Sequence, residues 1–120
     1  MPALRPSSIA LLWCGLLSTA MGALDYQRDV RPILSDHCFK CHGPDDAGRK
    51  GKLRLDVLED ALKPAKSGER AIIPGKADAS ELVKRVFTTD EDELMPPPAT
   101  KKPLTEAQKG ILKQWIKEGA

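Results

Sequence analysis

Any fold of this chain has to accommodate CFKCH, the segment from Cys38 to His42, in which two cysteines are separated by two residues and a histidine follows at once. Four kinds of site use such a spacing. They are covalent haem attachment, a zinc site, a thiol–disulfide exchange pair and a plain structural disulfide. Each requires a different structure around the motif, so the rest of the sequence decides among them.

The first two dozen residues have the pattern of a secretory signal peptide. Arg5 is the only charged residue before Asp25, the run IALLWCGLL is uncharged and almost wholly apolar, and small residues follow it. This run is far shorter than the roughly 20 residues of a membrane-spanning helix. We therefore expect residues 1–23 to be a signal peptide and residues 24–120 to be one domain, exported to the periplasm without stable membrane insertion.

Composition narrows the class of the exported domain. The full sequence has 19 basic and 17 acidic residues, and Arg5 is the only charge lost with the leader. So balanced a charge is not that of a nucleic-acid binder. A domain of about 100 residues with few large apolar side chains also has little surface to bury. A flat apolar cofactor would complete its core. The aromatic residues after the leader are Tyr26, Phe39, Phe87 and Trp115.

Two helices are expected in the first half of the domain. Apolar residues recur at helical spacing from Tyr26 to the cysteine motif. Pro32 must then lie either in the first turn of a helix that begins near Asp29 or at a kink. A second, short helix is expected over residues 57–62, with Asp56 as its N-cap. The alternating stretch KLRL before it is extended rather than helical.

Two more helices are expected in the second half. The third starts with Asp78 as the first residue of a capping box, and the fourth with Thr105 and Gln108 as a capping box. Gly119 is placed to cap the end of the fourth helix. Gly110 lies inside this helix, where glycine costs about 1 kcal/mol relative to alanine. Either a close helix–helix crossing explains it, or it is a tolerated substitution.

Three of the four chemistries fit poorly. A structural zinc site needs four ligands, usually in two pairs, and here the only cysteines and histidines after the leader lie within six positions. Thiol–disulfide exchange of the thioredoxin type requires a βαβ context, and no convincing pair of strands is present. A disulfide between Cys38 and Cys41 would close only a tiny loop and stabilise little.

Covalent haem attachment agrees with every part of the motif. Cys38 and Cys41 would form thioethers with the porphyrin vinyl groups, and His42 would be the proximal iron ligand. Since Met1 and Met21 leave with the signal peptide, Met95 is the only methionine left, in the stiff segment LMPPP. We expect Met95 to be the distal ligand, and histidine–methionine ligation raises the reduction potential.

Other basic side chains are assigned more loosely. His37 is tethered beside Cys38, so it is expected at the surface or at the edge of the haem rather than on the iron. Three further basic residues have no single expected role: they would pair with haem propionates, bind a partner protein or be ordinary surface charges. They are Lys52, Arg54 and Arg70.

The finer pattern resembles the planctomycete-type cytochrome c domain, a class I c-type cytochrome. The segments that carry the resemblance run from about Asp25 to the end of the chain: DVRPIL, CFKCHGPD, KLRLD, AIIPGKADASELVKRV, ELMPPP and KPLTEAQKGILKQWIKEGA. It implies a small all-α fold of about four short helices around one covalently bound haem c, with the first and last helices crossing near Gly110. It also implies Cys38 and Cys41 as attachment points, His42 as proximal ligand and Met95 as distal ligand.

These observations favour a periplasmic single-haem cytochrome that passes electrons to a redox partner protein and performs no catalysis of its own. An alternative is a haem-based sensor or peroxidase-like enzyme with an open sixth site, and another is a haem-free thiol pair. Members of the family usually carry this domain at the start of a longer secreted protein, whereas this chain ends at Ala120. A free carrier and a part of a larger oxidoreductase therefore both stay open, as does the oligomeric state.

Overall fold

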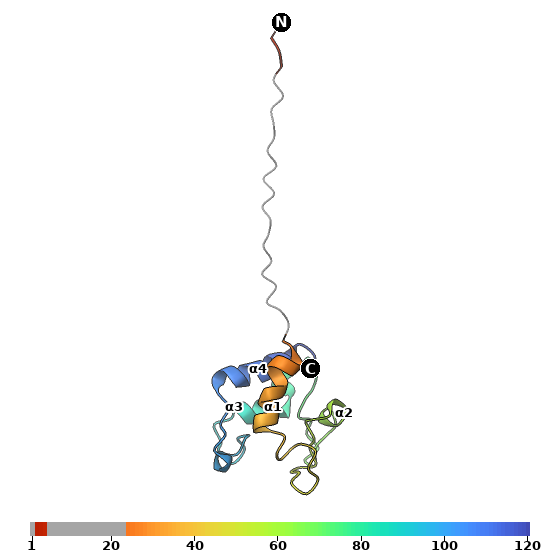
Figure 1. Ribbon diagram of the computed structural model, residues 1–120, viewed down its shortest axis with the longest axis vertical. Coiled ribbons are helices and arrows are strands. Elements are labelled where there is room, and N and C mark those ends of the chain that lie inside the picture. Colours follow the sequence, from red (N-terminus) through yellow and green to blue (C-terminus); the bar gives the residue numbers. More distant parts are fainter. Residues whose placement is uncertain (1, 5–23) are drawn as a thin grey trace.

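The computed structural model describes residues 2–4 and 24–120, so nearly all of the expected signal peptide lies outside the described residues. Figure 1 shows four α-helices, α1 (Arg31–His37), α2 (Leu58–Ala61), α3 (Glu81–Phe87) and α4 (Glu106–Lys117). Three single turns accompany them, a π-helical turn η1 (Tyr26–Val30) and the 3-10 turns η2 (Ala77–Ala79) and η3 (Pro98–Thr100). The described residues contain no strand, apart from an isolated antiparallel bridge between Pro64 and Arg70. The expected all-α class is confirmed.

The first helix starts with a wide turn and then tightens. Asp25 accepts a hydrogen bond from the backbone N–H of Arg28 (3.0 Å), and the N–H of Arg31 donates to the carbonyl of Tyr26, five residues back. Pro32 lies in the first turn of α1, where its missing N–H costs no helical hydrogen bond. Of the two alternatives for Pro32, the structure shows the first-turn position, and the helix changes its winding directly before α1.

The second helix is shorter than expected, and its predicted cap is wrong. Val57 occupies the N-cap position of α2 and makes no side-chain capping bond. The carboxylate of Asp56 is instead engaged by the guanidinium of Arg54, which donates to both carboxylate oxygens at 2.8 and 3.0 Å. Such a bidentate pair outcompetes a single N-cap bond. The KLRL stretch before it is not helical, as expected.

The third helix also has a different start from the predicted one. Ser80, not Asp78, is the N-cap of α3, and Asp78 lies in η2. The hydroxyl of Ser80 is fully buried and holds the preceding loop: it accepts the N–H of Ile73 (2.9 Å) and donates to the carbonyl of Lys76 (2.9 Å). The capping box at Asp78 is therefore wrong, because the helix begins two residues later than that spacing requires.

The fourth helix has both of its predicted ends. Thr105 accepts the N–H of Gln108 (3.1 Å), and the Gln108 side chain accepts the N–H of Thr105 (2.9 Å). At the other end Gly119 has a φ of 109°, which a residue with a Cβ adopts only with strain. Its N–H donates to Ile116, and the N–H of Ala120 donates to Trp115, both at 3.0 Å. This is a Schellman motif.

The close helix crossing expected at Gly110 is wrong. Gly110 is exposed, and a Cβ atom added there would meet nothing within 4 Å. Contact between the first helical segment and α4 runs instead through Tyr26 and Trp115, whose ring centroids lie 5.6 Å apart. The substitution is simply tolerated at a solvent-facing position.

The core lies where η1, α1, α3 and α4 meet. Its fully buried side chains come from the first helix, the loop before α3 and the last helix: Val30, Leu34, Ile72, Leu112 and Ile116. Phe87, at the end of α3, is 41% exposed, and the ammonium groups of Lys109 and Lys113 lie 6.0 and 5.7 Å from its ring centre. Figure 1 shows α2 and its flanking loops to one side of this core.

Candidate functional site

The CFKCH segment forms a helical turn at the end of α1. The N–H of Cys38 donates to the carbonyl of Leu34 (2.8 Å), and the N–H of His42 donates to the carbonyl of Cys38 (2.9 Å). Both thiols are free and partly buried. The turn therefore places two thiols and one imidazole on a single local unit.

The loop after the motif is fastened to it through three successive carbonyl groups. The N–H of Lys50 donates to Cys41 and the N–H of Leu55 donates to His42, both at 2.8 Å. The guanidinium of Arg49 donates to the carbonyl of Gly43 at 2.9 and 3.1 Å. Every peptide carbonyl from Cys41 to Gly43 is thus engaged, which fixes the backbone that carries the imidazole.

Gly43 is required by a close approach of two backbone segments. It is buried, and a Cβ atom built at this position would overlap the carbonyl oxygen of Phe39. No side-chain movement relieves a clash with backbone. The glycine directly after CFKCH is therefore part of the turn, a role that its position beside the motif signals only weakly.

The imidazole of His42 is held in one tautomer. Its Nδ1 lies 3.1 Å from the carbonyl oxygen of Lys50. Because a carbonyl only accepts, Nδ1 carries the proton and Nε2 keeps its lone pair. Burial lowers the pKa of His42 below its ordinary value, although its hydrogen bonds to backbone carbonyls work in the other direction. A neutral imidazole whose other nitrogen donates to a carbonyl is the usual state of a metal-binding histidine.

The Cys38 thiol lacks the electrostatics of an exchange-active cysteine. Burial, with a smaller contribution from the neighbouring Cys41, raises the pKa of the Cys38 thiol to about 12. Exchange-active thiols have depressed pKa values. Cys38 is therefore protonated at neutral pH in the protein without cofactor.

One large cavity joins the four predicted site residues. It has a volume of about 930 Å³, in the range of small-molecule and cofactor sites. Cys38, Cys41, His42 and Met95 all line it. Much of the remaining wall is apolar: Leu53, Leu55, Ala71, Leu82, Val86 and Leu112. A flat apolar cofactor that takes two thioether links and nitrogen and sulfur ligands fits this lining.

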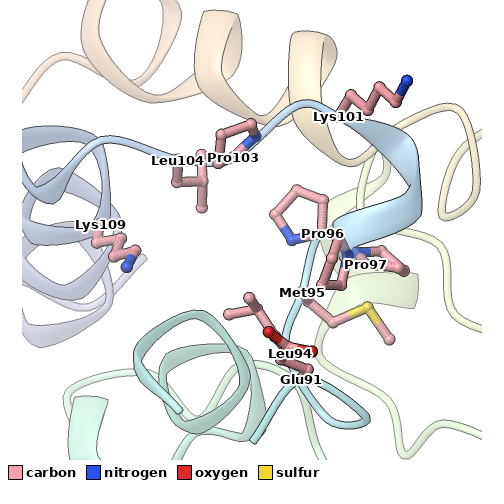
Figure 2. Close-up of a pocket in the computed structure, with 10 residues that line it drawn as sticks. Glu91, Leu94, Met95, Pro96, Pro97, Lys101, Pro103, Leu104 and Lys109 are labelled. Atoms are coloured by element: carbon pink, nitrogen blue, oxygen red, sulfur yellow. The ribbon is translucent and has the colours of Figure 1, made fainter. Parts of the chain in front are cut away.

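Met95 lies on the loop between α3 and α4, far along the sequence from the cysteine motif. Its N–H donates to the carbonyl of Arg85 (3.1 Å), which ties the loop to α3. Met95 and Pro96 also border a second cavity of about 470 Å³ on the other side of the loop. Figure 2 shows that the Met95 thioether points away from the space between Leu94, Pro103 and Lys109 in this second cavity.

The loosely assigned basic residues do not line the large cavity. Arg54 is paired with Asp56, Arg70 donates to the carbonyl of Leu62 (3.1 Å), and Lys52 is exposed. The basic side chains that do line the cavity are Lys40, Lys50, Arg85 and Lys102. Sequence reasoning missed them, because nothing local distinguishes them from other surface charges.

Comparison with known families decides the class of the protein. The family model described as Planctomycete cytochrome C matches residues 38–99, more than half of the chain of 120 residues. The chain belongs to this family of c-type cytochromes. The match begins at Cys38 and ends just after the MPPP segment. It therefore includes both segments that line the cavity with predicted site residues, the cysteine motif and the loop with Met95. No curated protein and no solved structure matches the chain.

Membership of the planctomycete cytochrome c family implies that the chain binds haem c. Over residues 2–4 and 24–120, no group of three or more His, Cys, Asp or Glu side chains is placed to hold a metal ion. None of the helices in that same part of the chain has the length and apolar character needed to cross a membrane.

Proposed function

We propose that this planctomycete cytochrome c is a single-haem electron carrier with histidine–methionine ligation. The observation that supports it is the shared cavity, where CFKCH at the end of α1 and Met95 on the α3–α4 loop line the same apolar space. Bound haem c supplies one-electron exchange between Fe(III) and Fe(II). The residues of the chain hold that group and shape its surroundings.

Each site residue has one role in this proposal. Cys38 and Cys41 carry the covalent links, and His42 presents Nε2 because its Nδ1–H is engaged by Lys50. Met95 supplies a thioether from the opposite wall, which favours the reduced state and raises the potential. Lys40 and Lys50, which line the cavity, are basic groups available to the haem carboxylates, whereas Arg85, which also lines it, donates to Glu81 at 2.9 Å.

The surroundings suit electron transfer rather than bond-making chemistry. The apolar lining excludes water and lowers the local dielectric, which sets the potential and limits ligand access. In the proposal a redox partner protein receives or supplies single electrons at the exposed edge of the site. The chain performs no catalysis itself.

Export belongs to the same proposal. Residues 1–23 act as a signal peptide, residues 24–120 as the cytochrome domain, and haem is attached in the periplasm. Expression in a bacterium with a c-type maturation system, followed by fractionation, tests this directly. We expect haem-stained protein in the periplasmic fraction with a mass lowered by the leader. Uncleaved cytoplasmic protein would contradict it.

Absorption spectra of the purified protein, oxidised and reduced, with and without CO, test the ligation. We expect covalent low-spin haem that does not respond to CO. Covalent haem that binds CO readily would overturn the carrier and favour the sensor or peroxidase-like alternative with an open sixth site. Protein purified without any haem would instead support the alternative in which CFKCH is a haem-free thiol pair.

A further inference from the structure

The segment that carries Met95 is a thin wall between two cavities. Met95, Pro96 and Pro97 line both the haem cavity of about 930 Å³ and the second cavity of about 470 Å³. Figure 2 shows the second cavity open behind this segment, bordered by Leu94, Pro103 and Leu104. A wall with empty space behind it lacks the dispersion contacts that normally hold a core segment in place.

Polar contacts hold the loop that contains this wall at two places, Met95 and Lys102. At the start, the N–H of Met95 donates to the carbonyl of Arg85 (3.1 Å). At the far end, Nδ1 of His37 lies 2.9 Å from the carbonyl oxygen of Lys102, and Nζ of Lys102 lies 3.0 Å from Oδ1 of Asp36. The hydrogen bonds of Thr100 and Lys101 in between stay within the loop, to Pro97 and Pro98.

His37 is the part of this fastening that is shielded from water. Its side chain is only 8% exposed, whereas those of Asp36 and Lys102 are 61% and 56% exposed. Its Nδ1 donates, since a carbonyl can only accept, and its Nε2 lies 3.3 Å from Oδ2 of Asp36. An exposed ion pair contributes little, so most of the restraint falls on the His37–Lys102 bond.

We infer that His37, assisted by the Asp36–Lys102 pair, is a positioning residue that holds the Met95 wall closed over the haem cavity. His37 directly precedes Cys38, so the bond joins the segment that carries the thioether links to the segment that carries Met95. The inference rests on the proposed histidine–methionine ligation. Asp36, His37 and Lys102 themselves line the haem cavity, and the clamp acts on the iron site through the position of Met95.

Three variants of His37 separate a clamp from a merely structural histidine. His37→Leu removes the donor and keeps an apolar side chain of similar reach. His37→Asn places an amide N–H at the position of Nδ1, so it can still donate to the Lys102 carbonyl. His37→Gln places its amide N–H at the position of Nε2, so it loses this hydrogen bond. Lys102→Met removes the exposed ion pair and leaves the backbone carbonyl in place. Lys101→Met is the matched control.

The probe is imidazole binding to the oxidised holoprotein by stopped flow, because it requires Met95 to leave the iron. We expect His37→Leu and His37→Gln to bind imidazole about two- to tenfold faster than wild type, the range of one lost hydrogen bond. His37→Asn should stay within about twofold of wild type. Lys102→Met should show a smaller increase than His37→Leu, and Lys101→Met none.

Equal imidazole rates for wild type, His37→Leu and His37→Gln would overturn the clamp. So would a His37→Asn variant as fast as His37→Gln, because then the donor position is irrelevant. If His37→Leu does not accumulate, the Asn and Gln pair decides alone. Met95→Leu keeps the two proposals apart: if it binds imidazole no faster than wild type, the distal ligation itself fails, whatever the His37 series shows.

Discussion

The carbonyl oxygen of Lys50 lies 3.1 Å from Nδ1 of His42, and the same residue donates its N–H to the carbonyl of Cys41. A single residue of the following loop therefore contacts both the imidazole and the backbone beside the second thiol. With Nδ1 donating to this carbonyl, Nε2 is the nitrogen whose lone pair can bind a metal.

Replacing His42 by alanine should remove the proximal ligand and spare the thioether links. We expect the His42→Ala protein to keep covalent haem through Cys38 and Cys41 and to lose its low-spin spectrum. Added imidazole should restore the spectrum by entering the space that is left. Heme staining on denaturing gels and visible spectra check this. An unchanged low-spin spectrum without imidazole would show that another residue is the proximal ligand.

Replacing Met95 by leucine should open the distal side. The reduction potential should fall because the soft thioether no longer stabilises the reduced iron, and CO should bind to the reduced protein. Redox titration and CO difference spectra measure both. A potential and a CO response equal to those of wild type would contradict the distal assignment.

Gly43 should not tolerate a methyl group, whereas Gly110 should. The Gly43→Ala Cβ overlaps the Phe39 carbonyl, and such overpacking costs about 1–3 kcal/mol. Gly110→Ala is the matched control, since a Cβ there meets nothing within 4 Å and helix propensity improves by up to about 1 kcal/mol. Chemical denaturation should show shifts of opposite sign. A neutral Gly43→Ala would mean that the turn can relax.

The buried hydroxyl of Ser80 should contribute measurably to stability. Ser80→Ala leaves the N–H of Ile73 and the carbonyl of Lys76 without their partner, at a cost of about 1–3 kcal/mol. Ser67→Ala is the control, because the Ser67 hydroxyl also accepts an N–H, from Glu69 (3.2 Å), but at an exposed position where water can replace it; the unfolding free energy should change by less than about 0.5 kcal/mol. Equal effects of the two substitutions would show that the Ser80 bonds are replaced by water.

The only tyrosine of the chain should titrate at high pH. Burial against the core raises the pKa of Tyr26 above 10.0, partly offset by Arg31. The neutral phenol is favoured in the folded state, so its contribution to stability is complete below pH 10.0 and disappears as the pH rises through the folded-state pKa. Ultraviolet difference titration, with Tyr26→Phe as the blank, measures this. A midpoint at or below 10.0 would contradict it.

Local signals were read correctly from the sequence, because their partners lie within a few residues. The Thr105–Gln108 box, the Gly119 cap and the placement of Pro32 all depend on one turn of backbone. The CFKCH spacing likewise carries its meaning within five positions, and the family match bears out the recognition of a planctomycete cytochrome c domain. The ligand roles stay predictions.

Three misreadings concern features that the local pattern leaves open. Asp56 has the right position for an N-cap, but Arg54 engages its carboxylate. Asp78 has the right spacing for a capping box, but the helix starts at Glu81. Periodicity places Gly110 in a helix without saying which face meets a neighbour. Such outcomes depend on tertiary contacts that no local pattern encodes.

The contact between His37 and Lys102 joins positions separated by 65 residues. Closing a loop of that size carries an entropic cost that grows only as the logarithm of its length, yet it has to be met before any contact across it forms. We therefore expect the segment carrying Met95 to be secured late in folding, after the local turns. A cofactor already bonded to Cys38 and Cys41 would lower this cost, because it would offer the segment carrying Met95 a surface to pack on before the His37–Lys102 bond forms.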